Sequence, residues 1–354
     1  MDAKIKKPRV MVTGAAGYLG SWCTALLLEQ GCQVNATVRS LQDHAKLAHL
    51  LELQNKFPGQ LHLFAADLLK EASFDAAAKD AHVIMHTASP YTLAKVADAK
   101  AQILDPAVLG TRNVLGSATR STTVQKVVLT SSIVAMFGSL REVHALPAHT
   151  LTEQCWNISS NLQDDPYPFS KASAERAAWD IYAQQSRWQM VTLAPGAIFG
   201  PSLSHRSDGE SVKMILQFLQ GSFAAGVPAL HLGVVDVRDV ALAHVRAALQ
   251  SNVSGRYLLV SRTCRLLEIA RAIVAKHPEF SLHLPKKEVP KWLIWLMGPL
   301  VGLSRSYIRD NVGYPVSFDC QRAQTELGID FRHPEQTLAD QVAQLRRDGL
   351  VWHE

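Results

Sequence analysis

Tyr167 and Lys171 lie four residues apart and have the residue types for proton transfer. Residues with this spacing share one face of a helix, and a helix is predicted over 167–186. A lysine ammonium beside a phenol favours the phenolate and lowers a pKa that starts at about 10. Tyr167 could then give a proton to a carbonyl oxygen, or take one from an alcohol. Ser132 follows a predicted strand over 126–130, and its hydroxyl could hold the same oxygen as charge develops on it.

A hydride donor for such a reaction could bind at a glycine-rich turn. Gly14, Gly17 and Gly20 follow an apolar strand over 10–12 and precede a helix over 21–30. Strand, glycine turn and helix together are the context of a dinucleotide site. Gly14 would allow the tight turn, Gly17 would let the backbone approach a pyrophosphate, and Gly20 would let helix and strand pack closely. Lys171 could reach the nicotinamide ribose. The alternative is a glycine-rich turn without a ligand.

The end of the second predicted strand, 33–39, indicates which dinucleotide binds. An acidic residue at this place bonds the ribose of NAD, whereas an arginine accommodates the 2′-phosphate of NADP. The chain has Arg39 there and no carboxylate until Asp43, which favours NADP(H). Lys46, on the following helix, could add a second cation. The alternative is that Arg39 is only a solvated cation at the end of a strand.

Predicted strands and helices alternate along most of the chain. Strands are expected over 10–12, 33–39, 60–66, 81–86, 126–130, 190–194 and 256–260, and helices over 21–30, 45–56, 106–120, 167–186, 211–220 and 239–250. This alternation predicts a doubly wound parallel α/β sheet. Its strands are apolar throughout, which suits a sheet covered on both faces. Ligands of such sheets bind beyond the carboxyl ends of the strands.

The regular alternation ends after Pro195, and the last third of the chain is rich in proline. We therefore expect a dinucleotide-binding domain over 1–200, with a returning segment near 230–260. The remaining segments, 201–229 and 261–354, are expected to form a smaller substrate-binding cap.

The composition argues against several other classes of protein. The chain has 354 residues and a net charge of +5, without a run of Lys or Arg typical of nucleic-acid binding. Its five cysteines are scattered without metal-ligand spacing, so we expect a reducing, cytoplasmic location and no metal site. No secretory signal is recognised. The apolar stretch 292–303 is too short to span a bilayer. It is expected to form a buried helix or a pocket wall, with peripheral membrane contact as the alternative.

Several short motifs, taken together, resemble those of the extended short-chain dehydrogenase/reductase family. Within that family the chain is most similar to the dihydroflavonol reductase-like and cinnamoyl-CoA reductase-like enzymes. The motifs run in family order over about two thirds of the chain: Thr13–Gly20, Ala36–Arg39, Ala66–Leu68, His86–Pro90, Thr130–Ser132, Tyr167–Lys171, Pro195–Pro201 and Val237–Ala241. The last third matches more loosely, through Glu326–Gly328 and the final helix.

The resemblance implies a Rossmann-type sheet, an NADPH/NADP+ cofactor and a catalytic triad of Ser132, Tyr167 and Lys171. Asp67 would bond the adenine with Leu68 beside it, and Ser131 would neighbour the cofactor. The other residues expected along the cofactor are Ala16, Tyr18, Leu19, Thr87, Ala88, Ser89, Pro195, Gly196, Ala197, Ile198 and, with weaker support, Ser211. The candidates for an apolar substrate pocket are Tyr91, Val134, Phe137, Phe169 and Phe199.

The expected activity is NADPH-dependent reduction of a small, apolar or aromatic aldehyde or ketone by a monomer or homodimer. A 3β-hydroxysteroid dehydrogenase, a sugar-nucleotide epimerase and a non-catalytic dinucleotide sensor are the alternatives. Arg39 argues against the epimerase, and the presence of both Tyr167 and Lys171 argues against the sensor. Acyl-CoA-reducing relatives carry a Trp-Tyr-Cys segment before the catalytic tyrosine, where this chain has residues 163–166 without it. This departure favours a plain carbonyl over a thioester.

Overall fold

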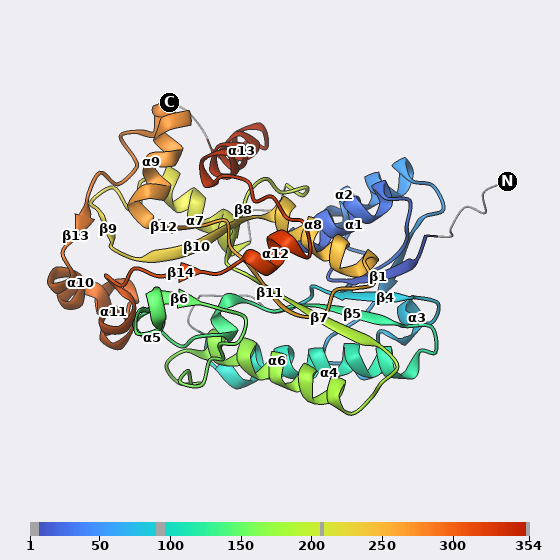
Figure 1. Cartoon of the computed structure of the whole chain (residues 1–354). Helices are drawn as coiled ribbons and strands as arrows, with labels where there is room; N and C mark the ends of the chain where they lie inside the picture. Colours follow the sequence, from blue (N-terminus) through green and yellow to red (C-terminus); the bar gives the residue numbers. More distant parts are fainter. Residues whose placement is uncertain (1–6, 90–95, 206–208, 352–354) are drawn as a thin grey trace.

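The computed structural model describes residues 7–89, 96–205 and 209–351. A parallel sheet of seven strands forms the centre of the larger part of the molecule (Figure 1). From one edge to the other its strands are β11 (Gly255–Leu259), β7 (Gln189–Pro195), β5 (Lys126–Thr130), β4 (Val83–His86), β1 (Arg9–Thr13), β2 (Gln33–Val38) and β3 (Leu61–Ala65). The order reverses beside β1, as in a doubly wound sheet. The predicted fold class is confirmed.

Both faces of the sheet are covered because its strands are apolar along their whole length. In β1, Val10 and Val12 enter one hydrophobic core and Met11 enters another on the opposite face. Alternate residues of a strand point to opposite faces, so one short apolar strand supplies both cores. One core holds side chains from α1 (Tyr18–Glu29), α2 (His44–Lys56) and α8 (Val237–Leu249). The other holds side chains from α3 (Asp75–Ala78), α4 (Asp105–Arg120) and α6 (Pro166–Ala183).

The smaller part of the molecule lies beyond the carboxyl ends of β5 and β7 (Figure 1). Its strands form a three-stranded sheet, β12 (Arg262–Arg265), β10 (His231–Asp236) and β8 (Ala197–Phe199), and two pairs, β9 (Val227–Pro228) with β13 (Glu288–Val289) and β6 (Thr150–Leu151) with β14 (Ser317–Phe318). Its helices are α5 (Leu140–His144), α7 (Glu210–Leu219), α9 (Leu266–Lys276), α10 (Lys291–Met297), α11 (Arg305–Asn311) and α13 (Pro334–Arg347). Short turns of helix lie in both parts of the molecule: η1 (Lys100–Leu104) precedes α4 and packs on α6, η2 (Ile133–Ala135) also packs on α6, and the others are η3 (Pro147–His149), η4 (Pro278–Phe280) and η5 (Gly298–Val301).

The boundary expected between sheet and cap is crossed in both directions: α5, β6 and β8 belong to 1–200 but lie in the smaller part, and one segment near the C-terminus does the reverse. Helix α12 (Gln321–Thr325) and the turn after it place Ala323, Leu327 and Ile329 in the same core as β1 and α8. Part of 261–354 therefore packs against the main sheet rather than in the cap.

The prediction that 292–303 forms a buried helix or a pocket wall is wrong. In α10 only Ile294 is buried, and it packs with Ile308 and Val312 in a small core. Trp292 and Leu296 are 69% and 58% exposed. The segment is apolar on every side, but only one side of it meets the rest of the molecule. None of the described helices is long and apolar enough to cross a bilayer.

Candidate active site

The glycine turn has the backbone geometry that its spacing predicts. Gly14 has a φ of 65°, and a Cβ there would lie 3.0 Å from Cα of Ala88. A Cβ on Gly20 would overlap the carbonyl of Gly14, so helix α1 can approach the turn only with glycine at that position. Gly17 is the N-cap of α1, with no side-chain cap and no acidic residue in the first turn. The positive end of the helix dipole thus has no local anion, which suits a phosphate.

Hydrogen bonds between the ends of β1 and β4 hold this turn in place. The backbone N–H of Ala88 donates to Oγ1 of Thr13 over 3.0 Å, and Oγ1 of Thr13 lies 2.8 Å from Nδ1 of His86. The hydroxyl of Thr87 donates to the carbonyl of Thr13 over 2.6 Å. Burial, with a smaller contribution from the charge of Lys171, lowers the pKa of His86 to about 3. His86 is therefore neutral; it links the turn to the next strand and is no general acid.

The charged residues predicted to bind the 2′-phosphate and the adenine lie on the surface. Arg39 is exposed directly after β2. Lys46 is also exposed, but its ammonium lies 2.6 Å from the carboxylate of Asp43. Asp67 is exposed after β3, and one of its oxygens accepts from the backbone N–H of Leu69 over 2.9 Å. The backbone carbonyl of Leu68 accepts from Asn113 of α4 over 2.7 Å, which fixes this loop.

Helix α6 and the end of β5 carry the three residues predicted for catalysis. Tyr167 is half-buried in the first turn of α6, and Lys171 is buried one turn later. Burial lowers the pKa of Lys171 to about 8, and the nearby carboxylate of Glu175 opposes this effect. Ser132 is half-buried just after β5, and its Oγ accepts from the N–H of Val134 over 3.4 Å. That Tyr167, Lys171 and Ser132 act together as one catalytic group stays a prediction.

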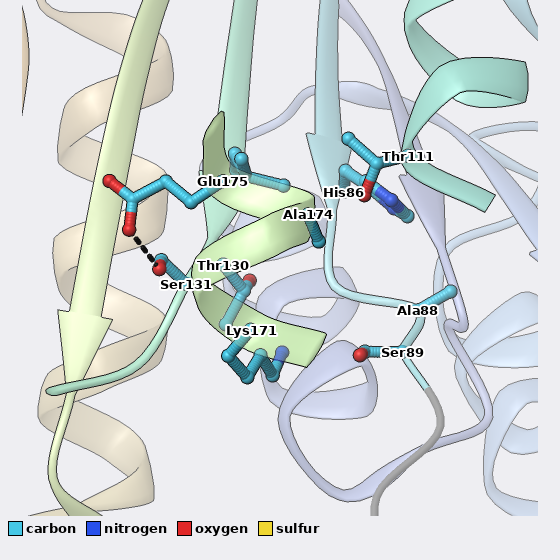
Figure 2. Close-up of a pocket in the computed structure, with 10 residues that line it drawn as sticks. His86, Ala88, Ser89, Thr111, Thr130, Ser131, Lys171, Ala174 and Glu175 are labelled. Atoms are coloured by element: carbon cyan, nitrogen blue, oxygen red, sulfur yellow. Dashed lines mark hydrogen bonds between the residues drawn. The ribbon is translucent and has the colours of Figure 1, made fainter. Parts of the chain in front are cut away.

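A cavity beyond the strand ends brings part of the predicted set together. Figure 2 shows Lys171 and Ser89 directed toward one side of it, and Glu175 and Ser131 on the other. The lining residues are His86, Ala88, Ser89, Thr111, Leu129, Thr130, Ser131, Lys171, Ala174 and Glu175. The cavity thus joins the proton-transfer helix to the strand that holds the glycine turn. Ser132 and Tyr167 do not line it.

Glu175 is a buried member of this cavity that was not among the residues predicted from the sequence. This side chain is 1% exposed, and it accepts a hydrogen bond from the hydroxyl of Ser131. Nε of Arg256 in β11 lies 2.7 Å from one carboxylate oxygen, and Nη2 lies 3.2 Å from the other. The guanidinium of Arg256 also lies 4.0 Å from the ring centroid of Trp156. The one available signal was the position of Glu175 four residues after Lys171 on the same helix face.

The other residues predicted to lie along the cofactor differ in how far they are buried. Pro195 is buried and Gly196, Ala197 and Ile198 are half-buried, between β7 and β8. A Cβ on Gly196 would overlap the carbonyl of Gly233, so this residue also permits a close backbone approach. Ser211 is half-buried in the first turn of α7, and Ala16 is half-buried in the glycine turn, whereas Leu19 belongs to the core under α1.

The apolar residues predicted for the substrate pocket do not form one group. Val134 and Phe137 pack together against a core near β6, and Phe169 is half-buried on α6. Phe199 is 1% exposed and lies in the core between β8, β10 and α7, so packing accounts for it. Tyr91 lies outside the described residues.

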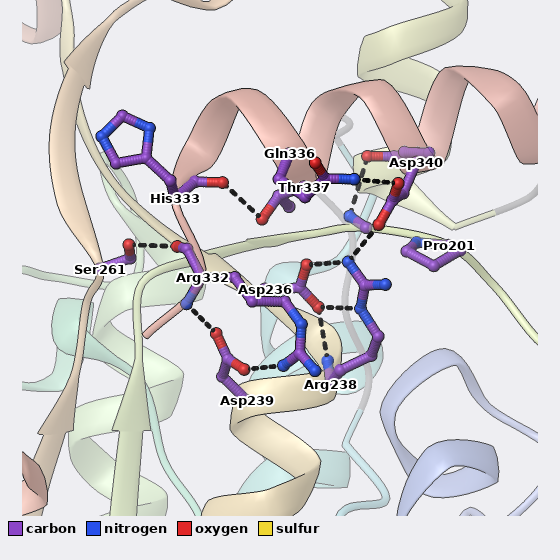
Figure 3. A network of polar contacts seen from close by, with 12 residues as sticks. Pro201, Asp236, Arg238, Asp239, Ser261, Arg332, His333, Gln336, Thr337 and Asp340 are labelled. Carbon is purple, nitrogen blue, oxygen red and sulfur yellow. Dashed lines mark hydrogen bonds and ion pairs between the residues drawn. The ribbon is translucent and has the colours of Figure 1, made fainter. Parts of the chain in front are cut away.

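Side chains from distant parts of the sequence join the cap to the sheet. The hydroxyl of Tyr18 donates to the carbonyl of Gly200 over 2.5 Å, and Nε1 of Trp22 donates to the carbonyl of Pro201 over 2.8 Å. Tyr18 was expected along the cofactor, but its hydroxyl is engaged here. Figure 3 shows Arg238 between two carboxylates, with Nη2 lying 2.7 Å from Asp236 and 2.7 Å from Asp340. Asp340 lies on α13, so this pair of contacts ties the last helix to the start of α8.

No group of three or more His, Cys, Asp or Glu side chains in the described part of the chain could hold a metal ion.

Comparisons with known proteins agree with this geometry. The chain is 40% identical over 281 residues to cinnamoyl-CoA reductase CAD2 of Medicago truncatula, covering 78% of this chain and 83% of the relative. It is 32% identical over 342 residues to cinnamoyl-CoA reductase 1 of Arabidopsis thaliana, covering 96% and 90%. The structure of Gre2 from Candida albicans in complex with NADPH is similar, with a TM-score of 0.79, 29% identity and coverage of 96% and 99%.

These relatives confirm the resemblance to the cinnamoyl-CoA reductase-like group. The family model described as NAD dependent epimerase/dehydratase matches residues 10–259. That match spans well over half of the chain, from β1 to β11. The chain belongs to the NAD dependent epimerase/dehydratase family.

Proposed function

We propose that this chain is an NADPH-dependent reductase that converts an aldehyde or a ketone to an alcohol. The observation that carries the proposal is the cavity shared by Lys171, His86 and Ala88. Lys171 follows Tyr167 by one helical turn, and Ala88 touches the glycine turn through Thr13. Lys171 of the proposed proton-transfer pair and a strand end that contacts the glycine turn therefore line one cavity, which supports hydride transfer coupled to protonation.

The residues present fit the cofactor. Gly14 and Gly20 leave room for the turn, and the N-terminus of α1 has neither a side-chain cap nor an acidic residue in its first turn. The pyrophosphate would lie at Gly17, the 2′-phosphate at Arg39 and the adenine at Asp67. The bound cofactor supplies the hydride. The rest of the chemistry belongs to the protein's own side chains.

In the proposed reaction Tyr167 gives its phenolic proton to the carbonyl oxygen as the carbon receives the hydride. Ser132 donates a hydrogen bond to that oxygen, where negative charge develops. The ammonium of Lys171 stabilises the phenolate that is left and binds the nicotinamide ribose. Solvent then returns a proton to Tyr167.

The cap and the cell compartment are part of the same proposal. Residues 201–229 and the parts of 261–354 outside α12 and its turn would form the substrate-binding cap. An apolar or aromatic substrate suits the half-buried Val134, Phe137 and Phe169. A cytoplasmic location is supported by the cysteines, since all five are free thiols and four of them are buried.

Reduction of an acyl-CoA thioester is the second candidate. The relative that is 40% identical to this chain is named a cinnamoyl-CoA reductase. Against it stands the absence of a Trp-Tyr-Cys segment before Tyr167. A thioester is therefore included beside plain carbonyls in the test.

The test is loss of NADPH absorbance with an aromatic aldehyde, an aromatic ketone, a diketone and an aromatic acyl-CoA thioester. We expect turnover with at least one plain carbonyl. Tyr167→Phe removes the proton donor and should lower kcat by about 10²- to 10⁴-fold while NADPH still binds. Retained turnover in Tyr167→Phe would refute the role of Tyr167. NADPH binding without oxidation by any of these compounds would favour a dinucleotide sensor.

A further inference from the structure

Of the exposed large apolar side chains in 261–351, all but Leu282 (79% exposed) lie on one short segment. They belong to α10 and η5, and we call them the apolar patch: Trp292 (69% exposed), Trp295 (45%), Leu296 (58%), Met297 (51%) and Leu300 (84%). Figure 1 shows α10 at the end of the molecule that lies farthest from β1 and the glycine turn. Soluble proteins rarely expose so many large apolar side chains together, so a contiguous patch of this kind marks an interaction surface.

The fold holds the apolar patch outward. Ile294 is the buried side chain of α10 and anchors the helix on Ile308 and Val312. The ammonium of Lys291 donates to the backbone carbonyls of Arg309 and Val312 over 2.9 and 2.7 Å, which pins the start of α10 to α11. The outward side chains are thus presented on a fixed helix and not on a loose loop.

Cations flank the apolar patch in the sequence, and one of them lies on it. Residues 282–309 contain five cations, Lys286, Lys287, Lys291, Arg305 and Arg309, and a single carboxylate, Glu288. That carboxylate lies 3.3 Å from Arg265, and so its charge is balanced within the fold. Arg309 lies 2.6 Å from Asp310, just beyond this stretch, so its charge is balanced too, and the excess of positive charge comes from Lys286, Lys287, Lys291 and Arg305. The guanidinium of Arg305 lies 4.4 Å from the ring centroid of Trp295, which places a cation directly on the apolar surface.

We propose that the apolar patch and its cations dock the protein on the surface of a membrane that contains anionic lipid. Tryptophan is favoured at the boundary between headgroups and acyl chains. A short helix with bulky apolar side chains enters that boundary, and neighbouring lysine and arginine side chains bind the anionic headgroups. The seven residues of α10 cannot span a bilayer, so the contact lies in the plane of the surface.

The same charges disfavour a second copy of the chain as the occupant. A symmetric contact through the apolar patch would bring the cations of both copies to one interface. Like charges placed together across an interface cost free energy and disfavour that pairing. An anionic lipid surface satisfies the apolar side chains and the cations at once.

The experiment is sedimentation of the full chain with vesicles of phosphatidylcholine, alone or mixed with phosphatidylserine. We expect the protein to sediment with the mixed vesicles, to bind pure phosphatidylcholine more weakly, and to be released by salt. Trp292→Ala/Trp295→Ala/Leu296→Ala should lower the partition coefficient about tenfold or more, because the loss of buried apolar area is large. Lys286→Glu/Lys287→Glu should lower it about tenfold, since each cation near an anionic surface contributes.

Matched controls come from residues outside the apolar patch and its flanking cations. Leu69→Ala/Ile158→Ala removes exposed apolar side chains outside the apolar patch, and Lys56→Glu/Lys79→Glu reverses exposed cations elsewhere. Both should bind as the unchanged chain does, and thermal melting checks the fold of every variant. The proposal is overturned if the unchanged chain does not bind mixed vesicles, or if the patch variants bind as tightly as the controls. A patch variant that changes only the KM of reduction or the mass in solution would instead assign these side chains to substrate or to a second copy. The measurement needs no substrate, so its outcome is independent of the proposed reaction.

Discussion

Two regions of the molecule are built in different ways. One is the set of strand ends around the glycine turn, which we call the cofactor edge, and the other is the junction where the cap meets the sheet. At the cofactor edge, the important contacts join neighbouring strand ends, such as Thr13 with His86 and Ala88. At the junction, side chains reach across the sequence to backbone groups, such as Tyr18 to Gly200, which is 182 residues away. Glycine spacing constrains the backbone locally and can be recognised in a sequence. A side chain that bonds a distant carbonyl leaves no such pattern.

Glu175 connects the two kinds of structure. It lies on α6, one turn after Lys171, yet its charge is balanced by Arg256 from the edge strand β11. Trp179 and Thr192 also donate to it, over 3.2 and 3.3 Å. The helix that carries Tyr167 and Lys171 therefore depends on a buried ion pair, Glu175 with Arg256, that the spacing of Tyr167 and Lys171 does not predict.

The largest effect on stability is expected from Glu175→Ala. The change leaves the charge of Arg256 buried without its carboxylate, which should lower the free energy of unfolding by about 3 to 5 kcal/mol. Denaturant unfolding measures the loss. Glu175→Gln keeps the shape and an acceptor, and should fold well enough to be measured if the alanine variant does not. The matched control is Glu210→Ala, because Glu210 pairs with the exposed Lys213 on α7 and should contribute less than about 1 kcal/mol. Equal losses in the two alanine variants would contradict a structural role for the buried pair.

A smaller loss is expected at the junction from Arg238→Met. Asp236 is fully buried and would keep only the backbone N–H of residue 238 as a donor, so we expect a loss of about 2 kcal/mol in unfolding free energy. Asp340→Asn removes the more exposed partner, and its effect should be smaller. Because the glycine turn is untouched, both variants should bind NADPH with an unchanged Kd by calorimetry. A large rise in Kd for Arg238→Met would show that cofactor edge and junction are not separable.

The same contrast explains how far the sequence could be interpreted. The parallel sheet, the turn at Gly14 and the positions of Ser132 and Lys171 beyond strand ends follow from apolar periodicity and motif spacing. Phe199 and the stretch 292–303 were misjudged in opposite directions, one being a core residue and the other exposed. Apolar character alone cannot show which face of an element meets the rest of the fold, because that depends on tertiary packing. Glu175 was missed for the same reason, since its partners come from β7 and β11.

A test confined to the cofactor edge is Arg39→Gln. If the guanidinium binds the 2′-phosphate, its removal should weaken NADPH binding about tenfold or more and leave NADH binding unchanged. Calorimetry with both cofactors separates the two outcomes. Lys46→Gln is the matched control with a smaller effect, since the Lys46 ammonium already lies beside Asp43. An equal loss of NADPH and NADH binding in Arg39→Gln would refute a role for Arg39 in phosphate binding.

The smallest and most specific effect is expected in the pH dependence of reduction. Burial lowers the pKa of Lys171 to about 8, so the ammonium that supports Tyr167 is lost as the pH rises above that value. The kcat/KM for reduction should therefore fall about tenfold per pH unit at higher pH, because it reports ionisations of the free enzyme. Lys171→Arg keeps its charge and should remove this limb, even if its maximal rate is lower. In the unfolded chain the lysine holds its proton up to 10.5, so stability from this group should rise between about 8 and 10.5.

Glu175→Gln sharpens this last measurement. The carboxylate of Glu175 raises the pKa of Lys171 against the effect of burial, so its neutral replacement should move the alkaline limb to lower pH. A purely structural role for Glu175 would lower the rate at every pH and leave the limb in place. A shifted limb would show that Glu175, which the motif does not include, helps to set the charge of Lys171.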